Sequence, residues 1–189
     1  MSADSVRAMG AKKAAASAPR PRSVDAQVSV APRFTTLLGF ALLAVLLQGT
    51  LLHDLTLRGA HASPLTVLIV WTGLRCGVVT GGWLGLLGGL FEDALGGGGV
   101  QVLGATLVGY LAGLLSNRFF SDSLPVFLSA VAVGTVVRSG VQYLVLEIGL
   151  GERGLFHRLS HETVYAIVLN CVIAAGAVLV LRVIAARSR

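Results

Sequence analysis

Charged residues are scarce in this sequence, and their scarcity excludes an ordinary water-soluble protein. They make up 13% of the 189 residues, whereas apolar residues make up 54%. A soluble domain carries roughly 25% charged residues, so this chain has too few to cover a globular surface in water. Each membrane-spanning helix needs about 20 residues, and the length suits one membrane domain with a tail. The composition therefore predicts an all-α fold, a polytopic bundle of membrane-spanning helices.

The sequence also lacks the patterns of soluble enzymes. It holds no glycine-rich phosphate loop with a following lysine and no nucleophile elbow around a serine. His157 and His161 lie four residues apart beside Glu162, but the order differs from His-Glu-x-x-His and a third ligand is not evident. Cys76 and Cys171 lack the spacing of a metal or redox pair and are interpreted as small buried apolar residues. We therefore expect no catalytic residue, no metal and no cofactor.

The positive charge of the chain gathers at its two ends. Six of the fifteen Lys and Arg residues lie in residues 1–33 and three more lie in residues 182–189, within a net charge of +6. No basic stripe interleaved with aromatic residues accompanies them, which argues against nucleic acid as a partner. Basic flanks can instead attract anionic lipid head groups. Residues 1–33 are predicted to form a disordered basic cytoplasmic tail, and residues 186–189 a basic cytoplasmic end.

Apolar runs between these ends predict a membrane domain of six helices over residues 34–185. The runs cover residues 34–52, 64–74, 77–95, 99–116, 124–148 and 162–184. The first run could instead be a signal peptide, but its apolar core exceeds the usual 7–15 residues and the preceding basic region is too long. The second run is short and ends at Arg75, so residues 64–90 could form one long broken helix and give five spans.

The distribution of Lys and Arg favours six spans over five. With a cytoplasmic N-terminus, six spans place eleven of the fifteen basic residues inside and three outside, with Arg138 within a span. Five spans would place one basic terminus on the outer side, against the positive-inside rule. We therefore expect six spans with both termini in the cytoplasm.

Small residues recur at intervals of four in two neighbouring spans. A spacing of four keeps residues on nearly one helix face, and small residues there let two helix backbones approach closely in lipid. We therefore expect these faces to pack against other helices of the bundle. The residues are Gly77, Gly81, Gly85 and Gly89 in the third span and Ala105, Gly109 and Gly113 in the fourth.

Four consecutive glycines, residues 96–99, follow the stripe. Each glycine costs a helix about 1 kcal/mol relative to alanine, so we expect a turn or a re-entrant break here. Glu92 and Asp93 lie at its edge. They could line a functional turn, or they could simply mark the head-group boundary of the membrane.

Arg138 lies fourteen residues into the span that begins near Leu124, close to the expected bilayer centre. A charge at that depth costs at least about 2.5–3.5 kcal/mol, so its side chain should face the bundle interior and find a partner. Glu147 lies roughly 13 Å further along the same helix, which is too far for a direct pair. We therefore predict an ion pair with Glu92 or Asp93, the alternative being that Arg138 extends to one membrane surface.

The stretch from Gly85 to Gly113 resembles the central signature of the MreD family of rod shape-determining membrane proteins. Members of that family look like G-x-x-x-D-x-x-x-G at the end of one helix, then a Leu-Gly segment and a helix that ends in Tyr-Leu. Gly96 stands where the family usually has serine, and the turn here is shorter. The residues that carry the resemblance are Gly89, Glu92, Asp93, Gly97, Gly99 and Tyr110.

The resemblance implies a non-enzymatic adaptor of the cell-elongation machinery in the bacterial inner membrane. Such proteins bind MreC and associate with the peptidoglycan synthase pair RodA and penicillin-binding protein 2, near the MreB filament. One alternative is the substrate-binding subunit of an energy-coupling-factor vitamin transporter, but its Ala-x-x-x-Ala pattern is not met by Ala41 and Ala44. Another is a membrane-embedded enzyme, for which Arg138 with Glu92 or Asp93 is the one candidate cluster.

Overall fold

The regular structure of this chain is helical throughout the part that the structure describes. A computed structural model describes residues 33–50, 59–96, 98–116, 123–149, 151 and 156–187. The expected tail over residues 1–33 lies outside these ranges, Arg33 excepted. The helices are α2 (Phe34–Thr50), α3 (Pro64–Cys76), α4 (Val78–Gly96), α5 (Gln101–Ser116), α6 (Leu124–Leu144), which continues into a π-helical turn η2 (Val145–Gly149), and α7 (Phe156–Arg187). The predicted all-α class is confirmed.

Helix α7 departs most from the predicted bounds. It begins at Phe156 and ends at Arg187, so it is longer at both ends than residues 162–184. Its 32 residues extend for about 48 Å at 1.5 Å per residue, which exceeds the roughly 30 Å of a bilayer core. The helix therefore continues into polar sequence, and Arg187 in its last turn stabilises the negative end of the helix dipole. The basic end expected over 186–189 thus begins inside this helix.

Among the described residues, two segments are long and apolar enough to cross a membrane by themselves. They are Leu124–Gly149, with 26 residues, and Ser160–Val183, with 24. Helices α2, α3 and α5 are apolar but shorter. Helix α3 has only 13 residues, and eight of them are buried by the other helices. Its surroundings are therefore mostly protein, which explains why its sequence is the weakest match to a lipid-facing span.

Helices α3 and α4 form an antiparallel hairpin that reverses at Gly77. Gly77 has φ +87° and ψ −177°, a backbone conformation essentially confined to glycine. Residues of α4 lie against residues of α3 along the hairpin. A Cβ placed on Gly81 would lie 2.7 Å from the Cα of Gly73, and one placed on Gly88 would lie 2.8 Å from the Leu65 side chain. Residues 64–90 are therefore two helices, which argues against one long broken helix. Gly77 was expected to begin the packing stripe, but a Cβ there would meet open space, because this residue forms the reversal.

Helices α4 and α5 pack antiparallel with their backbones in contact. A Cβ placed on Gly81 would lie 2.6 Å from the Gly109 carbonyl oxygen, and one on Gly85 would lie 2.8 Å from the Ala105 carbonyl carbon. Gly113 meets the start of α4 in the same way, at Val78. The small-residue faces of the two helices therefore lie against each other from one end of the hairpin to the other.

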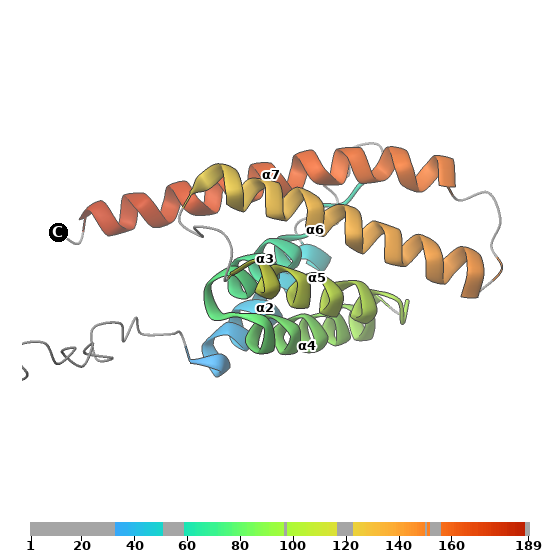
Figure 1. The fold of residues 1–189 in the computed structure, drawn as a ribbon, viewed down its shortest axis with the longest axis horizontal. Helices are drawn as coiled ribbons and strands as arrows, with labels where there is room; N and C mark the ends of the chain where they lie inside the picture. Colours follow the sequence, from blue (N-terminus) through green and yellow to red (C-terminus); the bar gives the residue numbers. More distant parts are fainter. Residues whose placement is uncertain are drawn as a thin grey trace, which may run out of the picture. The chain divides into compact units, whose positions relative to one another are not determined.

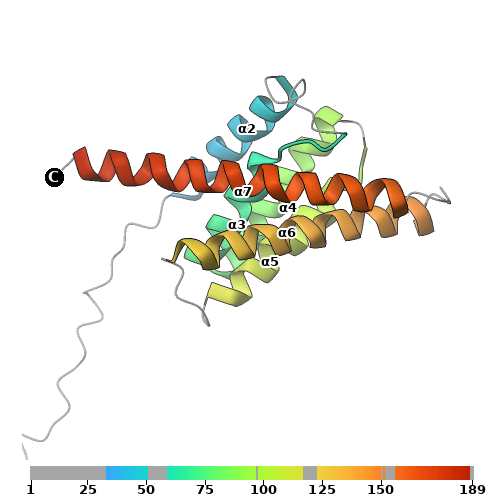
Figure 2. The same ribbon diagram turned by 90° about the horizontal axis from the view of Figure 1, so that it is seen from above.

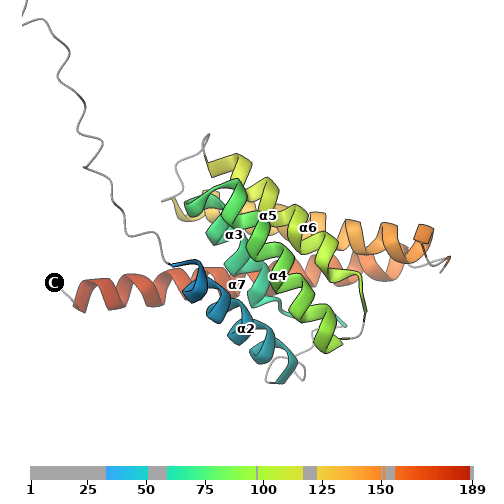
Figure 3. The same ribbon diagram turned by 90° about the horizontal axis from the view of Figure 1, so that it is seen from below.

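Helices α6 and α7 lie side by side and run in opposite directions, as Figures 1 and 2 show. Helices α2 to α5 lie together on one side of this pair, below it in Figure 1 and in front of it in Figure 3. Gly134 of α6 fits against Val70 of α3 and Val108 of α5. Helix α7 leaves much of its apolar surface exposed. The residues concerned are Val164, Val168, Val172, Leu179, Val180, Leu181 and Val183.

Candidate functional site

The buried arginine of α6, Arg138, binds polar side chains of α3, α4 and α5 and of Ser63, the N-cap residue just before α3. The Arg138 side chain passes α5 at Gly104, where the absence of a side chain leaves room for it. A Cβ placed on Gly104 would lie 3.1 Å from the Cγ of Arg138. Nη1 donates to Ser63 Oγ at 2.9 Å and to Thr66 Oγ1 at 2.6 Å. Nε and Nη2 donate to Gln101 Oε1 at 3.3 Å and 3.1 Å. Nη2 also donates to Glu92, so five hydrogen bonds match the five N–H groups of the guanidinium.

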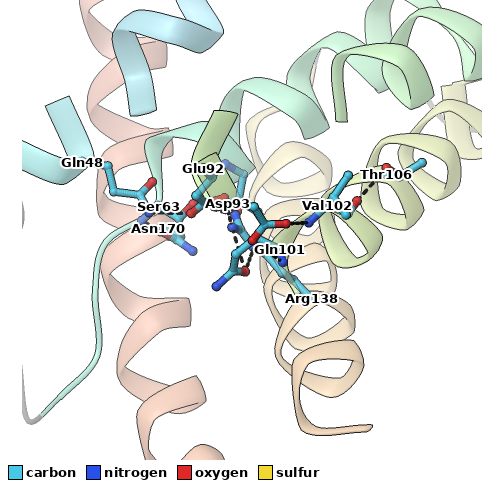
Figure 4. Close-up of polar contacts among 10 residues, drawn as sticks. Gln48, Ser63, Glu92, Asp93, Gln101, Val102, Thr106, Arg138 and Asn170 are labelled. Carbon is cyan, nitrogen blue, oxygen red and sulfur yellow. Dashed lines mark hydrogen bonds and ion pairs between the residues drawn. The ribbon is translucent and has the colours of Figure 1, made fainter. Parts of the chain in front are cut away.

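The charge of Arg138 is balanced by Glu92 at the end of α4. The predicted ion pair forms with Glu92 and not with Asp93, and the two side chains are only 10% and 12% exposed. Gln48 of α2 donates from Nε2 to the other carboxylate oxygen, Oε1, at 2.7 Å. Figure 4 shows Gln48, Glu92 and Arg138 converging. Because both charges lie away from water, their mutual neutralisation and hydrogen bonding offset a desolvation cost of several kcal/mol per ion.

Asp93 has a different task, because its carboxylate caps the first turn of α5. Oδ1 accepts from the backbone N–H of Gln101 and Oδ2 from that of Val102, each at 2.9 Å. The first N–H groups of a helix have no partner within the helix, and a negative charge there is favourable. Gly99, with φ +63°, helps to turn the chain between α4 and α5. Gly98 and Gly99 therefore lie in the turn between α4 and α5, and Asp93 stabilises the end of that turn where α5 begins.

Replacing Asp93 with alanine is expected to destabilise the start of α5 by about 1 kcal/mol, the usual cost of losing a cap. Hydrogen exchange at the amides of Gln101 and Val102 should then be roughly fivefold faster, since a factor of ten corresponds to about 1.4 kcal/mol. Asp93→Asn keeps one acceptor oxygen and should show a smaller change. Unchanged exchange in Asp93→Ala would show that the cap does not stabilise the turn.

A second set of polar contacts links α7 to the beginning of α3. Asn170 is 1% exposed although it lies in the middle of an apolar helix. Its Oδ1 accepts from the backbone N–H of Ser63 at 2.7 Å, and its Nδ2 donates to Thr135 Oγ1 at 3.0 Å. Ser63 is also the N-cap of α3, where its Oγ accepts from Thr66 N. The hydrogen bonds of the site therefore link helices α2 to α7 at the end of the bundle where α3 and α5 begin and α2 and α4 end.

These residues form part of the wall of a polar cavity of about 630 Å³. Most of its lining side chains carry amide, hydroxyl or carboxylate groups, and every helix from α2 to α7 contributes. Its polar lining includes Gln48, His61, Ser63, Thr66, Glu92, Gln101, Thr135, Arg138, Ser139, Gln142, Glu162, Thr163 and Asn170. A polar cavity among apolar helices is a candidate functional site, because polar groups at membrane depth are costly.

The predicted motif residues do not all meet at this site. Glu92 and Asp93 belong to it, Gly89 packs against Val102 near it, and Gly97 lies outside the described residues. Tyr110 is 48% exposed and lies nine residues, about 13 Å, along α5 from Gln101. Cys76 and Cys171 are partly exposed, not fully buried as expected.

Sequence reasoning missed several polar residues of the site, among them those that bind Arg138 and Glu92. Gln48, Ser63, Thr66, Gln101 and Asn170 are each a polar residue within or beside an apolar run. Polar side chains in such runs generally face the bundle interior and one another. That rule could have selected them as candidates, but it could not have paired them.

Comparison with known proteins gives one match. The family model described as rod shape-determining protein MreD matches residues 30–185 of the chain. That range includes the whole of α2 to α6 and nearly all of α7. No curated protein and no solved structure matches the chain.

Proposed function

This chain belongs to the MreD family of rod shape-determining membrane proteins, and on that premise we propose that it is a non-enzymatic adaptor of the bacterial cell-elongation complex. The observation that carries the proposal is the family match over residues 30–185. In this role the protein helps to organise peptidoglycan synthesis in the inner membrane. Its proposed partners are MreC and the synthase pair RodA and penicillin-binding protein 2, with MreB acting through them.

The geometry of the polar site supports a structural role over a catalytic one. Arg138 uses its N–H groups on neighbouring helices, and both oxygens of Glu92 accept hydrogen bonds from Arg138 and Gln48. A general acid or base must reach a substrate proton, and this ion pair is engaged within the bundle. The exposed apolar rows on α7 and on α2 suit contact with lipid or with helices of other membrane proteins.

We further propose six membrane crossings with both termini in the cytoplasm. The antiparallel order of α3, α4, α5, α6 and α7 supports this topology, as does the excess of basic residues that it places inside. The first crossing then ends on the outer side, so the end of the bundle with Gln48, Glu92 and Gln101 faces the periplasm. Helix α3, the shortest, can cross because its partner helices and not lipid surround much of its surface.

Depletion of this protein in its own rod-shaped host is expected to round the cells, because the elongation complex would lose its adaptor. Cell length-to-width ratio measured by microscopy checks this, with re-expression of the intact chain as the control. Affinity purification from membranes should recover MreC. Unchanged cell shape together with lost vitamin uptake would contradict the adaptor and support the transport alternative.

A further inference from the structure

The two charged groups at the centre of the cavity wall, Arg138 and Glu92, are already engaged by protein. Each N–H of Arg138 has an acceptor on Ser63, Thr66, Gln101 or Glu92. Glu92 accepts on both oxygens, from Arg138 and Gln48. An anionic ligand would have to displace Glu92 from Arg138, and a cationic ligand would have to displace Arg138 from Glu92. The central ion pair therefore disfavours charged ligands of either sign.

Several neutral groups of the wall have remaining hydrogen-bonding capacity. Gln48 Oε1 is buried and accepts no hydrogen bond within the described residues, although its amide nitrogen is engaged with Glu92. Gln101 uses its Oε1 for Arg138, which leaves its Nε2 available to donate into the cavity. Gln142 and Ser139 on α6 add a third amide and a hydroxyl to the same wall. The cavity thus offers uncharged donors and acceptors, and its wall adds the carboxylate of Glu162 to the neutralised pair of Arg138 and Glu92.

The size of the cavity suits a small molecule or one head group. Its volume of about 630 Å³ lies within the 300–1,000 Å³ typical of small-molecule sites. Val45, Leu95 and Ala166 give the wall apolar patches between its polar groups. Polar side chains at fixed positions orient the ligand in such sites, and here the uncharged ones are amides and hydroxyls.

We propose that this cavity binds an uncharged ligand rich in hydroxyl or amide groups. The carbonyl oxygen of Gln48 can accept from such groups, the amide nitrogen of Gln101 can donate to them, and Gln142 can do both. Anions are disfavoured because Glu92 occupies Arg138 and Glu162 adds a second carboxylate to the wall. The same chemistry is present in a free sugar and in the sugar head group of a glycolipid. The ligand site is independent of the adaptor role, and it is not a consequence of family membership.

The test uses the full chain in phosphatidylcholine nanodiscs, with the midpoint of thermal unfolding as the readout. Glucose and glucosyl diacylglycerol are the uncharged probes, free and lipid-linked, and inorganic phosphate and phosphatidic acid are their charged counterparts. At about a hundred times the dissociation constant, a bound probe should raise the midpoint by about 5 °C. We expect this rise with at least one uncharged probe and with neither charged one, and the responding probe identifies the source.

Two matched variants on α6 separate binding from general stabilisation by sugars. Gln142→Leu removes a cavity amide that has no part in the Arg138 hydrogen bonds, and it should abolish the rise. Val136→Leu changes an exposed apolar residue of the same helix and should retain it. The proposal is overturned if neither uncharged probe raises the midpoint, if Gln142→Leu responds like the intact chain, or if a charged probe raises it as much. Each of these outcomes leaves the depletion experiment on the adaptor role unaffected.

Discussion

Replacing Arg138 with alanine is expected to lower the free energy of unfolding by about 3–5 kcal/mol, the usual cost of breaking a buried ion pair. The loss has two physical parts. Glu92 would stay within the bundle, 12% exposed, with Gln48 as its remaining donor and no positive charge beside it. The acceptors on Ser63, Thr66 and Gln101 would lose their donor as well.

The measurement is an unfolding titration of the purified protein in micelles, followed by circular dichroism. Arg75→Ala is the matched control, because Arg75 is exposed at the end of α3 and lies 5.9 Å from the Trp71 ring centre. A cation–π contact of that kind contributes about 0.5–1 kcal/mol, so this control should lose little. If Arg138→Ala lost no more stability than Arg75→Ala, the ion pair would not hold the helices together.

Two further variants separate charge from geometry. Arg138→Lys keeps the charge but offers three donors on one atom, in place of five in a planar fork, so it should recover only part of the loss. Replacing both Arg138 and Glu92 with leucine removes the uncompensated charge altogether and should be milder than Arg138→Ala. A double variant as unstable as the single one would mean that the neutral contacts, and not the ion pair, carry the stabilisation.

Most helices of this chain could be predicted from its sequence, because apolar runs and glycines mark helices and their ends through local sequence alone. The bounds of α2, α4 and α5 agree with the runs at 34–52, 77–95 and 99–116 to within two residues. Helix α7 was placed less well, because backbone hydrogen bonds continue through the polar residues at its beginning. Hydropathy locates the part of a helix that suits lipid, and it does not locate the helix ends.

The carboxylate partner of Arg138 could be narrowed from the sequence to two residues, by the cost of burying a charge and by distance along the helix. A buried arginine needs a carboxylate, and Glu147 was too far along its own helix, which left Glu92 and Asp93. The choice between them depends on the turn between α4 and α5, which brings the first backbone N–H groups of α5 to the carboxylate of Asp93. The contacts of Gln48 and Asn170 depend on the relative positions of α2, α3 and α7, which local sequence patterns do not contain.

Replacing Gly85 with alanine is expected to destabilise the protein by about 2–3 kcal/mol, as overpacking of a tight contact does. The added Cβ would lie 2.8 Å from the carbonyl carbon of Ala105 and 2.9 Å from the Cα of Thr106. Both are backbone atoms, so no side chain can rotate away and the two helices must separate. Separation would also loosen the turn that Asp93 closes, because α4 and α5 carry its two ends.

Gly82→Ala is the matched control, since it makes the same change on the same helix where a Cβ would meet nothing within 4 Å. Alanine favours the helical state by about 1 kcal/mol over glycine, so Gly82→Ala should be neutral or stabilising in the same unfolding titration. The two variants therefore differ in sign although their chemistry is identical, and only the contact with α5 distinguishes them. Equal stability of Gly85→Ala and Gly82→Ala would contradict backbone contact between α4 and α5. Opposite shifts would show that the stripe stabilises the bundle through close approach, because helix propensity alone would favour alanine at both positions.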